Sequence, residues 1–156
     1  MNFIKVAGTI RTSVVNGEGI RYSIFTQGCP HKCSGCHSPH TWDIKKGEKK
    51  NILDIFIDII KNRRFIDGVT LSGGDPIMQL PQILLLCKLL KVYNINIWMW
   101  SGFEMKEIKQ NAPELLKYID VMIDGRYDET KPTTKKWRGS DNQNKWIKED
   151  GKWRKE

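Results

Sequence analysis

Short apolar segments alternate with longer amphipathic ones along this chain. Residues 20–28 (IRYSIFTQG) are rich in β-branched and aromatic side chains and predict a strand that runs into a loop with three cysteines. Residues 67–76 (DGVTLSGGDP) predict a short strand that ends in a glycine loop. Residues 94–102 (NINIWMWSG) are apolar on both alternating faces, as expected for a strand covered on both sides. Residues 120–125 (DVMIDG) predict one further strand.

Helical patterns separate these strands. In residues 51–64, Asn51 is expected to cap an amphipathic helix, whose buried stripe is predicted to be Ile52, Ile55, Phe56, Ile59 and Ile60. A second helix is expected to begin near Pro81, because proline suits the first helical turn. A third helix is predicted over about residues 104–118. The Asp-Gly dipeptide at residues 150–151 favours a type I′ hairpin turn.

The repeated order of strand, loop and helix indicates right-handed βαβ units and a parallel sheet. A complete eight-unit barrel has about 250 residues, whereas this pattern supplies roughly four or five parallel strands. We therefore expect an α/β fold, a partial and open β/α barrel of mostly parallel strands. Because no repeat or linker interrupts the pattern, residues 1–156 are expected to form a single domain, with a basic polar C-terminal segment from about residue 126.

Charge adds a possible partner surface to this picture. The formal net charge is +8, and residues 126–156 contribute +4 of it through 10 Lys or Arg against 6 Asp or Glu. Such a segment is either a solvated surface or a docking face for an acidic partner. No apolar run reaches the roughly 18 residues that span a bilayer, and the first residues lack a signal-peptide core. We expect a cytoplasmic location, where thiols stay reduced.

The loop TQGCPHKCSGCHSPHTW (residues 26–42) holds the most informative chemistry. It places Cys29, Cys33 and Cys36 within eight residues. One interpretation is a structural zinc site with a histidine as fourth ligand, although the usual zinc spacings separate two pairs of ligands. A second interpretation is a C-x-x-C redox pair, which leaves Cys29 without a role. The third is an iron–sulfur cluster with one iron that has no protein ligand.

The spacing favours the cluster, because the C-x3-C and C-x2-C gaps let three sulfurs converge from one loop. The iron without a protein ligand could then bind a reactant. The remaining cysteine, Cys87, lies in the apolar stretch LLLCKLL and is expected to be a buried thiol. His31 and His40 are expected to be ordinary loop residues.

Two motifs together resemble the radical S-adenosylmethionine (SAM) enzymes: C-x3-C-x2-C after the first predicted parallel strand, and SGGDP after the second. Further segments are similar to the glycyl-radical activases of that superfamily, namely NGEGIRYSIFTQGC, HKCSGCH, WMWSGF, DVMIDGRY and WRGSDNQ. The resemblance extends from about Asn16 to the end of the chain. It implies a barrel of the radical SAM type.

The resemblance also implies a reaction and its partners. Cys29, Cys33 and Cys36 would bind a 4Fe–4S cluster whose open iron chelates SAM. An electron from the cluster would cleave SAM to methionine and a 5′-deoxyadenosyl radical, which would take hydrogen from a glycine of the anaerobic ribonucleotide reductase large subunit. The electron would come from a donor such as flavodoxin or ferredoxin. No catalytic acid or base, no membrane and no nucleic acid is expected.

The GGDP motif is the expected site for the methionine part of SAM. Gly73 and Gly74 permit close approach and would offer carbonyl groups to the ammonium. Asp75 would supply a carboxylate, either to amides of its own loop or to the cation. Pro76 would stiffen the exit from the loop.

The residues around the third cysteine are expected to lie near the adenine. Many radical SAM enzymes have an aromatic residue just before that cysteine, whereas this chain has Gly35, followed by Cys36 and His37. The activases are similar in using glycine there, which assigns the adenine to Gly35 and His37. Ser101 and Asp124, at later strand ends, are further candidate SAM contacts.

The C-terminal residues Trp137 and Arg138 are expected to border the open side of the barrel or to dock the reductase. Two other functions stay open at this point. One is another small radical SAM enzyme, similar to a deazapurine synthase, and the other is a non-enzymatic zinc-binding module.

Overall fold

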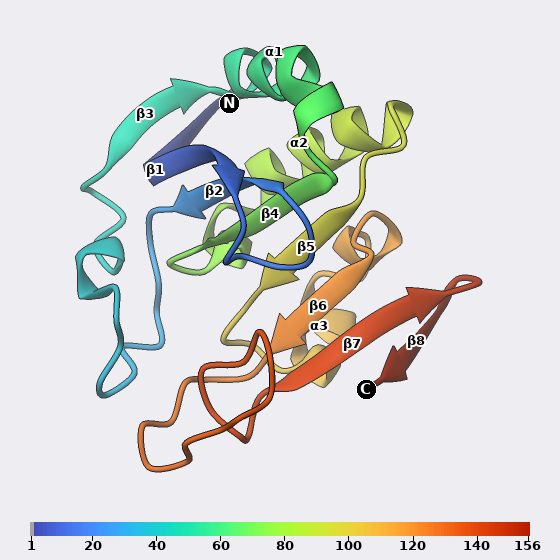
Figure 1. Ribbon diagram of the computed structural model, residues 1–156. Coiled ribbons are helices and arrows are strands. Elements are labelled where there is room, and N and C mark those ends of the chain that lie inside the picture. Colours follow the sequence, from blue (N-terminus) through green and yellow to red (C-terminus); the bar gives the residue numbers. More distant parts are fainter. Residues whose placement is uncertain (1) are drawn as a thin grey trace.

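The computed structural model describes residues 2–156 and contains one eight-stranded sheet with the order β3-β1-β2-β4-β5-β6-β7-β8 (Figure 1). The strands are β1 (Phe3–Ser13), β2 (Arg21–Thr26), β3 (Glu48–Asn51), β4 (Gly68–Gly73), β5 (Ile97–Trp100), β6 (Val121–Asp124), β7 (Asn144–Glu149) and β8 (Lys152–Lys155). The α-helices are α1 (Ile52–Asn62), α2 (Leu80–Val92) and α3 (Met105–Asn111). Short 3-10 turns are η1 (Pro39–Thr41), η2 (Arg63–Phe65), η3 (Pro76–Gln79) and η4 (Leu115–Lys117).

The centre of the sheet is parallel. Strands β2, β4, β5 and β6 pair in sequence order, and a helix lies in each connection between them. Antiparallel strands extend the sheet on both sides, with β1 and β3 beyond β2 and with β7 and β8 beyond β6. The predicted α/β fold with a mostly parallel central sheet is confirmed, with four parallel strands. The sequence pattern did not predict β1 or β3.

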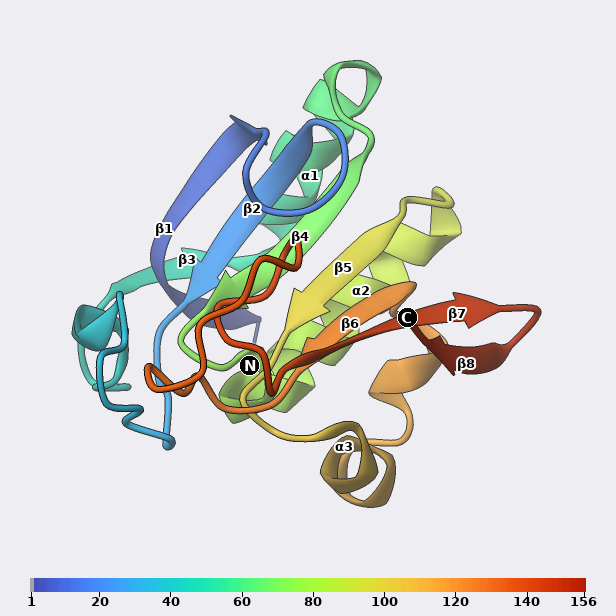
Figure 2. The ribbon, with the colours of Figure 1, turned by 60° about the horizontal axis from the view of Figure 1, so that its bottom comes forward.

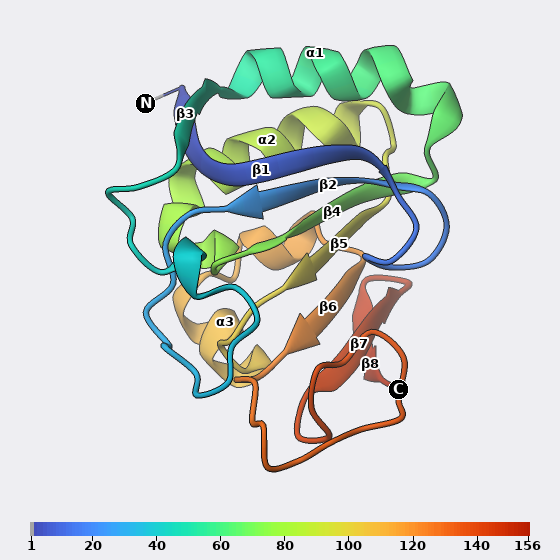
Figure 3. The same cartoon turned by 60° about the vertical axis from the view of Figure 1, so that its left-hand side comes forward.

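The two faces of the sheet are covered by different parts of the chain. In β5, Ile97 and Met99 point into the main core, where α1 and α2 pack along the sheet (Figure 3). Trp98 and Trp100 alternate with them and join a second apolar cluster with Trp137. Figure 2 shows the segment 126–143 crossing this second face in front of β4 and β5. This chain segment therefore covers the face that the helices leave free.

Most local predictions are confirmed. The Asn51 side chain accepts a hydrogen bond from the backbone N–H of Leu53 (2.8 Å) and caps α1. Asp150 and Gly151 both have positive φ, at 51° and 75°, as the type I′ turn between β7 and β8 requires. The predicted helix over residues 104–118 is wrong in extent. It divides into α3 and η4 because the residue before a proline, here Ala112, disfavours the helical conformation. Within residues 2–156, no helix is long and apolar enough to cross a bilayer.

A buried arginine ties the N-terminal ends of three parallel strands together. Arg21 is 2% exposed, and its guanidinium donates to Thr70 Oγ1 (2.8 Å) and to Asn96 Oδ1 (2.7 Å). The guanidinium carbon lies 5.3 Å from the ring centre of Trp98. Burial lowers the pKa of Arg21 to about 10. These contacts hold the end of the sheet that lies away from the candidate site.

Candidate active site

A cavity of about 280 Å³ opens at the C-terminal ends of the parallel strands. Loops after β2, β4 and β5 line it together with the segment 126–143. The structure brings seven of the predicted site residues to its wall, namely Cys29, Cys33, Cys36, His37, Gly73, Gly74 and Ser101. Gly35, Asp75, Pro76 and Asp124 are not among the lining residues.

The cysteine loop, residues 27–43, is fastened to the sheet at its base. The backbone N–H of Gly28 donates to the carbonyl of Thr41 (2.6 Å), and that of Cys29 donates to the carbonyl of Trp42 (3.2 Å). The buried side chain of Gln27 donates to the carbonyls of His40 (2.8 Å) and Asp43 (2.9 Å). The outgoing and returning limbs of the loop are thereby held side by side.

All three thiols of this loop are free and partly exposed to the cavity. Burial raises the pKa of the Cys29 thiol. The backbone N–H of Ser38 donates to Cys36 Sγ (3.4 Å). Hydrogen bonds to cysteine sulfur are one way in which a protein sets the reduction potential of an iron–sulfur cluster. By contrast, Cys87 is fully buried on α2, as predicted.

Glu129, in the segment 126–143, explains why a glycine precedes the third cysteine. Gly35 has φ of +76°, which favours glycine, and a Cβ there would collide with the carboxylate of Glu129. Ser34 Oγ donates to Glu129 Oε1 (2.8 Å). Gly35 therefore faces Glu129, and it is not among the residues that line the cavity.

The GGDP loop packs directly against the base of the cysteine loop. A Cβ on Gly73 would collide with the backbone nitrogen of Thr26, and a Cβ on Gly74 would collide with the carbonyl oxygen of Gly28. The backbone N–H of Asp75 donates to that same carbonyl (2.8 Å). Pro76 is buried in the first turn of η3. The glycines are thus required for the contact between the two loops as well as for space in the cavity.

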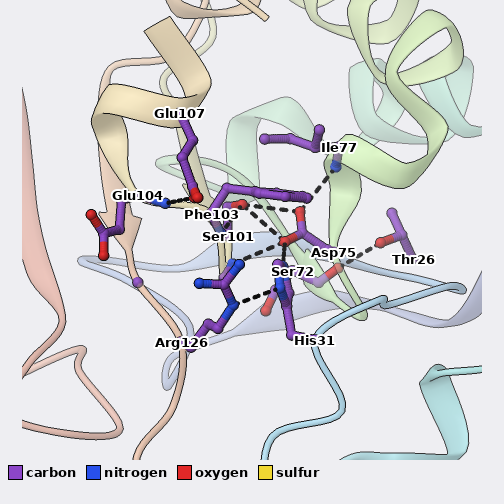
Figure 4. Close-up of polar contacts among 12 residues, drawn as sticks. Thr26, His31, Ser72, Asp75, Ile77, Ser101, Phe103, Glu104, Glu107 and Arg126 are labelled. Carbon is purple, nitrogen blue, oxygen red and sulfur yellow. Dashed lines mark hydrogen bonds and ion pairs between the residues drawn. The ribbon is translucent and has the colours of Figure 1, made fainter. Parts of the chain in front are cut away.

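The carboxylate of Asp75 is fully buried and is surrounded by donors from the protein (Figure 4). Oδ1 accepts from the backbone N–H of Ile77 (3.1 Å), which caps η3. Oδ2 accepts from the backbone N–H of Gly102 (2.9 Å), and Ser101 Oγ lies within 3.0 Å of both oxygens. Of the two roles that the sequence allowed, these contacts match the first, in which Asp75 serves the loops' own donors.

His31 is one residue of the cavity wall that sequence reasoning missed. Its side chain is 3% exposed, and its Nε2 lies 2.7 Å from Asp75 Oδ2. The expectation of an ordinary loop residue was wrong because only the fold brings the cysteine loop over the GGDP loop. The sequence offered no signal beyond the position of His31 between two cysteines. His40, in contrast, is exposed as expected.

The other two strand-end candidates differ from each other. Ser101 lines the cavity while its hydroxyl is bonded to Asp75. Asp124 is 2% exposed, and its Oδ2 accepts from the backbone N–H of Met105 (2.6 Å) at the start of α3. Asp124 therefore supports the loop below the cavity and does not face it.

Aromatic residues complete the wall on the side of the segment 126–143. Tyr127 lines the cavity, and its ring centre lies 5.4 Å from that of His37. Trp100 also lines the cavity and donates its indole N–H to the carbonyl of Trp137 (2.9 Å). Sequence reasoning did not assign Tyr127 or Trp100 to the site, since only the crossing of the C-terminal segment places them there.

The donors present fit an iron–sulfur cluster. In residues 2–156, no group of His, Cys, Asp or Glu side chains is placed to hold a single metal ion. The three cysteines instead line one cavity, and a cluster is larger than one ion. Thiolates are the ligands that such clusters use, and three of them leave one iron for a non-protein ligand.

A match to a protein family agrees with this chemistry. Residues 15–146 match the family described as 4Fe-4S single cluster domain. Among solved structures, QueE from Escherichia coli matches with a TM-score of 0.49 and 18% identity, over 64% of this chain and 52% of its own.

Curated relatives match over most of their length. A protein of Enterobacteria phage T4 is 40% identical over 147 residues, which cover 90% of this chain and 92% of the relative. A protein of Vibrio cholerae is 38% identical over 142 residues, or 83% of this chain and 89% of the relative. Both are named anaerobic ribonucleoside-triphosphate reductase-activating protein. The chain therefore belongs to the family of anaerobic ribonucleoside-triphosphate reductase-activating proteins.

Proposed function

We propose that this chain generates a glycyl radical on an anaerobic ribonucleoside-triphosphate reductase, using a 4Fe–4S cluster and SAM. The observation that carries the proposal is one cavity that is lined both by three free thiols and by the two glycines at the end of β4. The names of the relatives supply the reductase as the protein acted on. When bound, the cluster supplies one electron that cleaves SAM to methionine and a 5′-deoxyadenosyl radical, which takes a hydrogen atom from the glycine.

The residues of this chain would hold and orient the reactants. Cys29, Cys33 and Cys36 would hold three irons, and the fourth would take the amino and carboxylate groups of SAM. The carbonyls of Gly73 and Gly74 would receive the ammonium. The cavity positions of these five residues support this arrangement.

The adenine would lie against the aromatic side of the cavity. His37 and Tyr127 form a tilted ring pair on that wall. A planar base stacks favourably on such rings. Ser101 would contribute to the site through its bond to Asp75. Gly35 and Asp124 would act indirectly, by shaping the loops around the cavity.

The sheet supports a partial, open β/α barrel of the radical SAM type as the finer description of the fold. Four parallel strands are half the number in a complete barrel. A glycine on a loop of a large protein needs an open side to reach the 5′-carbon of SAM. We propose that residues 1–156 act as one domain and that the reductase closes the open side and excludes water.

Basic residues of the segment 126–143 would dock the reductase. A cleft of about 430 Å³ is lined by four cations and two carboxylates together with Trp137, namely Lys135, Lys136, Arg138, Lys145, Glu18 and Glu156. The carbonyl of Trp137 accepts a hydrogen bond from Trp100 on the cavity wall. This cleft would take an acidic surface of the large subunit. A one-electron donor such as flavodoxin or ferredoxin would reduce the cluster. A cytoplasmic location would keep the three thiols reduced.

The test is an anaerobic incubation of the reduced, iron-loaded protein with SAM and the reductase. The expected products are methionine, 5′-deoxyadenosine and a glycyl-radical signal by electron paramagnetic resonance. Deoxyadenosine without a radical on the protein would retain SAM cleavage and reject the reductase as substrate. A colourless protein that binds zinc and no iron would reject the cluster as well.

A further inference from the structure

The contacts of His31 define a role that the three cysteines do not explain. We infer that His31 is a positioning residue, which couples the cysteine loop to the loops that hold SAM. This inference rests on the proposed function and deepens it. It concerns one side chain that lines the same cavity as the three cysteines and whose Nε2 is bonded to Asp75, through which it acts (Figure 4).

The hydrogen bonds of His31 fix the position of its ring proton. Arg126 Nε donates to His31 Nδ1 (3.2 Å), so Nδ1 is the acceptor. The proton of the neutral ring is therefore on Nε2, which donates to Asp75 Oδ2 at 2.7 Å. His31 thus connects an arginine at the end of β6 with a buried carboxylate at the end of β4.

The ring of His31 packs between Phe103 and Gly102, and it also lines the cavity. Its centre lies 4.5 Å from that of Phe103, edge to face at 73°. Gly102 lies against the other part of the ring, because a Cβ there would collide with Cδ2 of His31. With 3% of the side chain exposed, His31 and not bulk water is the donor to Asp75 from this side.

The consequence is that one carboxylate joins the ends of several parallel strands. The carboxylate of Asp75 accepts hydrogen bonds from Ser101 and Gly102 in the loop after β5. It accepts another from His31 in the cysteine loop. Without the bond from His31, the cysteine loop keeps its clamp at the base but loses its attachment near the GGDP loop. The open iron and the methionine site would then no longer be held at one fixed separation, which reactions of this kind require.

Replacement of His31 by glutamine and by asparagine gives a matched pair. Both side chains carry an amide, but only that of glutamine extends far enough to place an N–H near the position of Nε2. Cluster content is measured as iron per chain, and SAM binding is measured by the change that SAM causes in the paramagnetic resonance spectrum of the reduced cluster. Neither readout requires the reductase.

We expect all variants to retain iron, because the three cysteines are unchanged. His31→Asn should weaken SAM binding by about tenfold or more, the effect of losing a hydrogen bond to a charged group. His31→Gln should restore binding to within about threefold of the wild type. Equal SAM binding in both variants, whether weak or unchanged, would overturn the inference. If SAM does not alter the wild-type spectrum, the proposed function fails instead.

An exposed position provides a variant that spares the core. Arg126 is exposed, and its side chain donates a hydrogen bond to His31 Nδ1. Arg126→Ala removes this donor without a buried cavity and should weaken SAM binding less than His31→Asn. Suppose that Arg126→Ala leaves SAM binding unchanged and that His31→Gln and His31→Asn bind SAM equally well. His31 would then serve only in packing, and the inference would be rejected.

Discussion

The side chain of Ser34, between the second and third cysteines, donates a 2.8 Å hydrogen bond to the carboxylate of Glu129 on the segment 126–143. The two residues are 95 positions apart in the sequence. The cysteine loop is therefore held by its own base, by the GGDP loop and by the C-terminal segment. Preorganisation of this kind is what a site needs when its residues come from loops.

Gly35 should be intolerant of a side chain. Gly35→Ala places a Cβ at φ of +76° and against Glu129. We expect a loss of about 1–2 kcal/mol in the free energy of unfolding from the backbone alone, and faster loss of iron to a chelator. The measurements are thermal or denaturant unfolding and the rate of iron release.

Gly151→Ala is the matched control for backbone strain. Gly151 has φ of +75° in the hairpin between β7 and β8, with no atom near its missing Cβ. This variant should lose similar stability but release iron at the wild-type rate. If both glycine variants release iron equally fast, the contact between Gly35 and Glu129 does not matter for the cluster.

The three cysteines of the loop should be required for iron, and the fourth should not. Cys29→Ala, Cys33→Ala and Cys36→Ala each remove one thiolate from a site with three, and most of the bound iron and sulfide should be lost. Cys87→Ala removes a thiol that is buried on α2 and should retain the full iron content, at a cost of about 1 kcal/mol in stability. The measurement is the iron and sulfide content of each variant after anaerobic reconstitution. Loss of iron in Cys87→Ala alone would reverse the assignment.

Cys87 should also make the fold sensitive to alkali. Burial raises the pKa of the Cys87 thiol to about 12, so the folded chain keeps a proton that the unfolded chain releases near pH 9. Stability is then fully present below pH 9 and falls as the pH rises towards 12. Cys87→Ala should show a shallower decline in the free energy of unfolding between pH 9 and about 11. Parallel curves for the two proteins would contradict the shifted pKa.

Charge reversal in the basic cleft should weaken the complex with the reductase. Lys135→Glu combined with Arg138→Glu changes two of the cations that line it. We expect affinity to fall by about tenfold or more at low salt, with less difference at high salt, because exposed charges are screened. Lys61→Glu, on the exposed end of α1, makes half of that charge change at a position outside the cleft and should bind normally. Undiminished complex formation and radical yield in the double variant would reject the docking surface.

The sequence predicted the parallel centre of the fold because each element there has a strong local pattern. The apolar stretch of β5 and the capped amphipathic helix α1 are examples. Strand β1 escaped prediction because five of its eleven residues are exposed, so its apolar and polar positions do not alternate cleanly. The proline after Ala112 was a signal for the end of α3. The prediction passed over it because the residues on both sides follow a helical pattern.

The candidate site was predictable where its chemistry is local. Three cysteines in one loop and two glycines after a strand are visible without a fold. The roles of His31, Tyr127 and Glu129 depend on contacts between loops that follow different strands, and no spacing along the chain encodes them. Asp75 combines the two cases. Its GGDP motif was evident in the sequence, but its hydrogen-bond partners in other loops were not.

The most direct test of the central claim follows the hydrogen atom. The reductase is prepared with glycine deuterated at the α-carbon and is incubated anaerobically with the reduced protein and SAM. Our account predicts that the 5′-deoxyadenosine gains one deuterium, seen by mass spectrometry, in step with the appearance of the glycyl radical. Unlabelled 5′-deoxyadenosine, formed while the glycyl radical appears, would contradict direct abstraction from the glycine at this cavity.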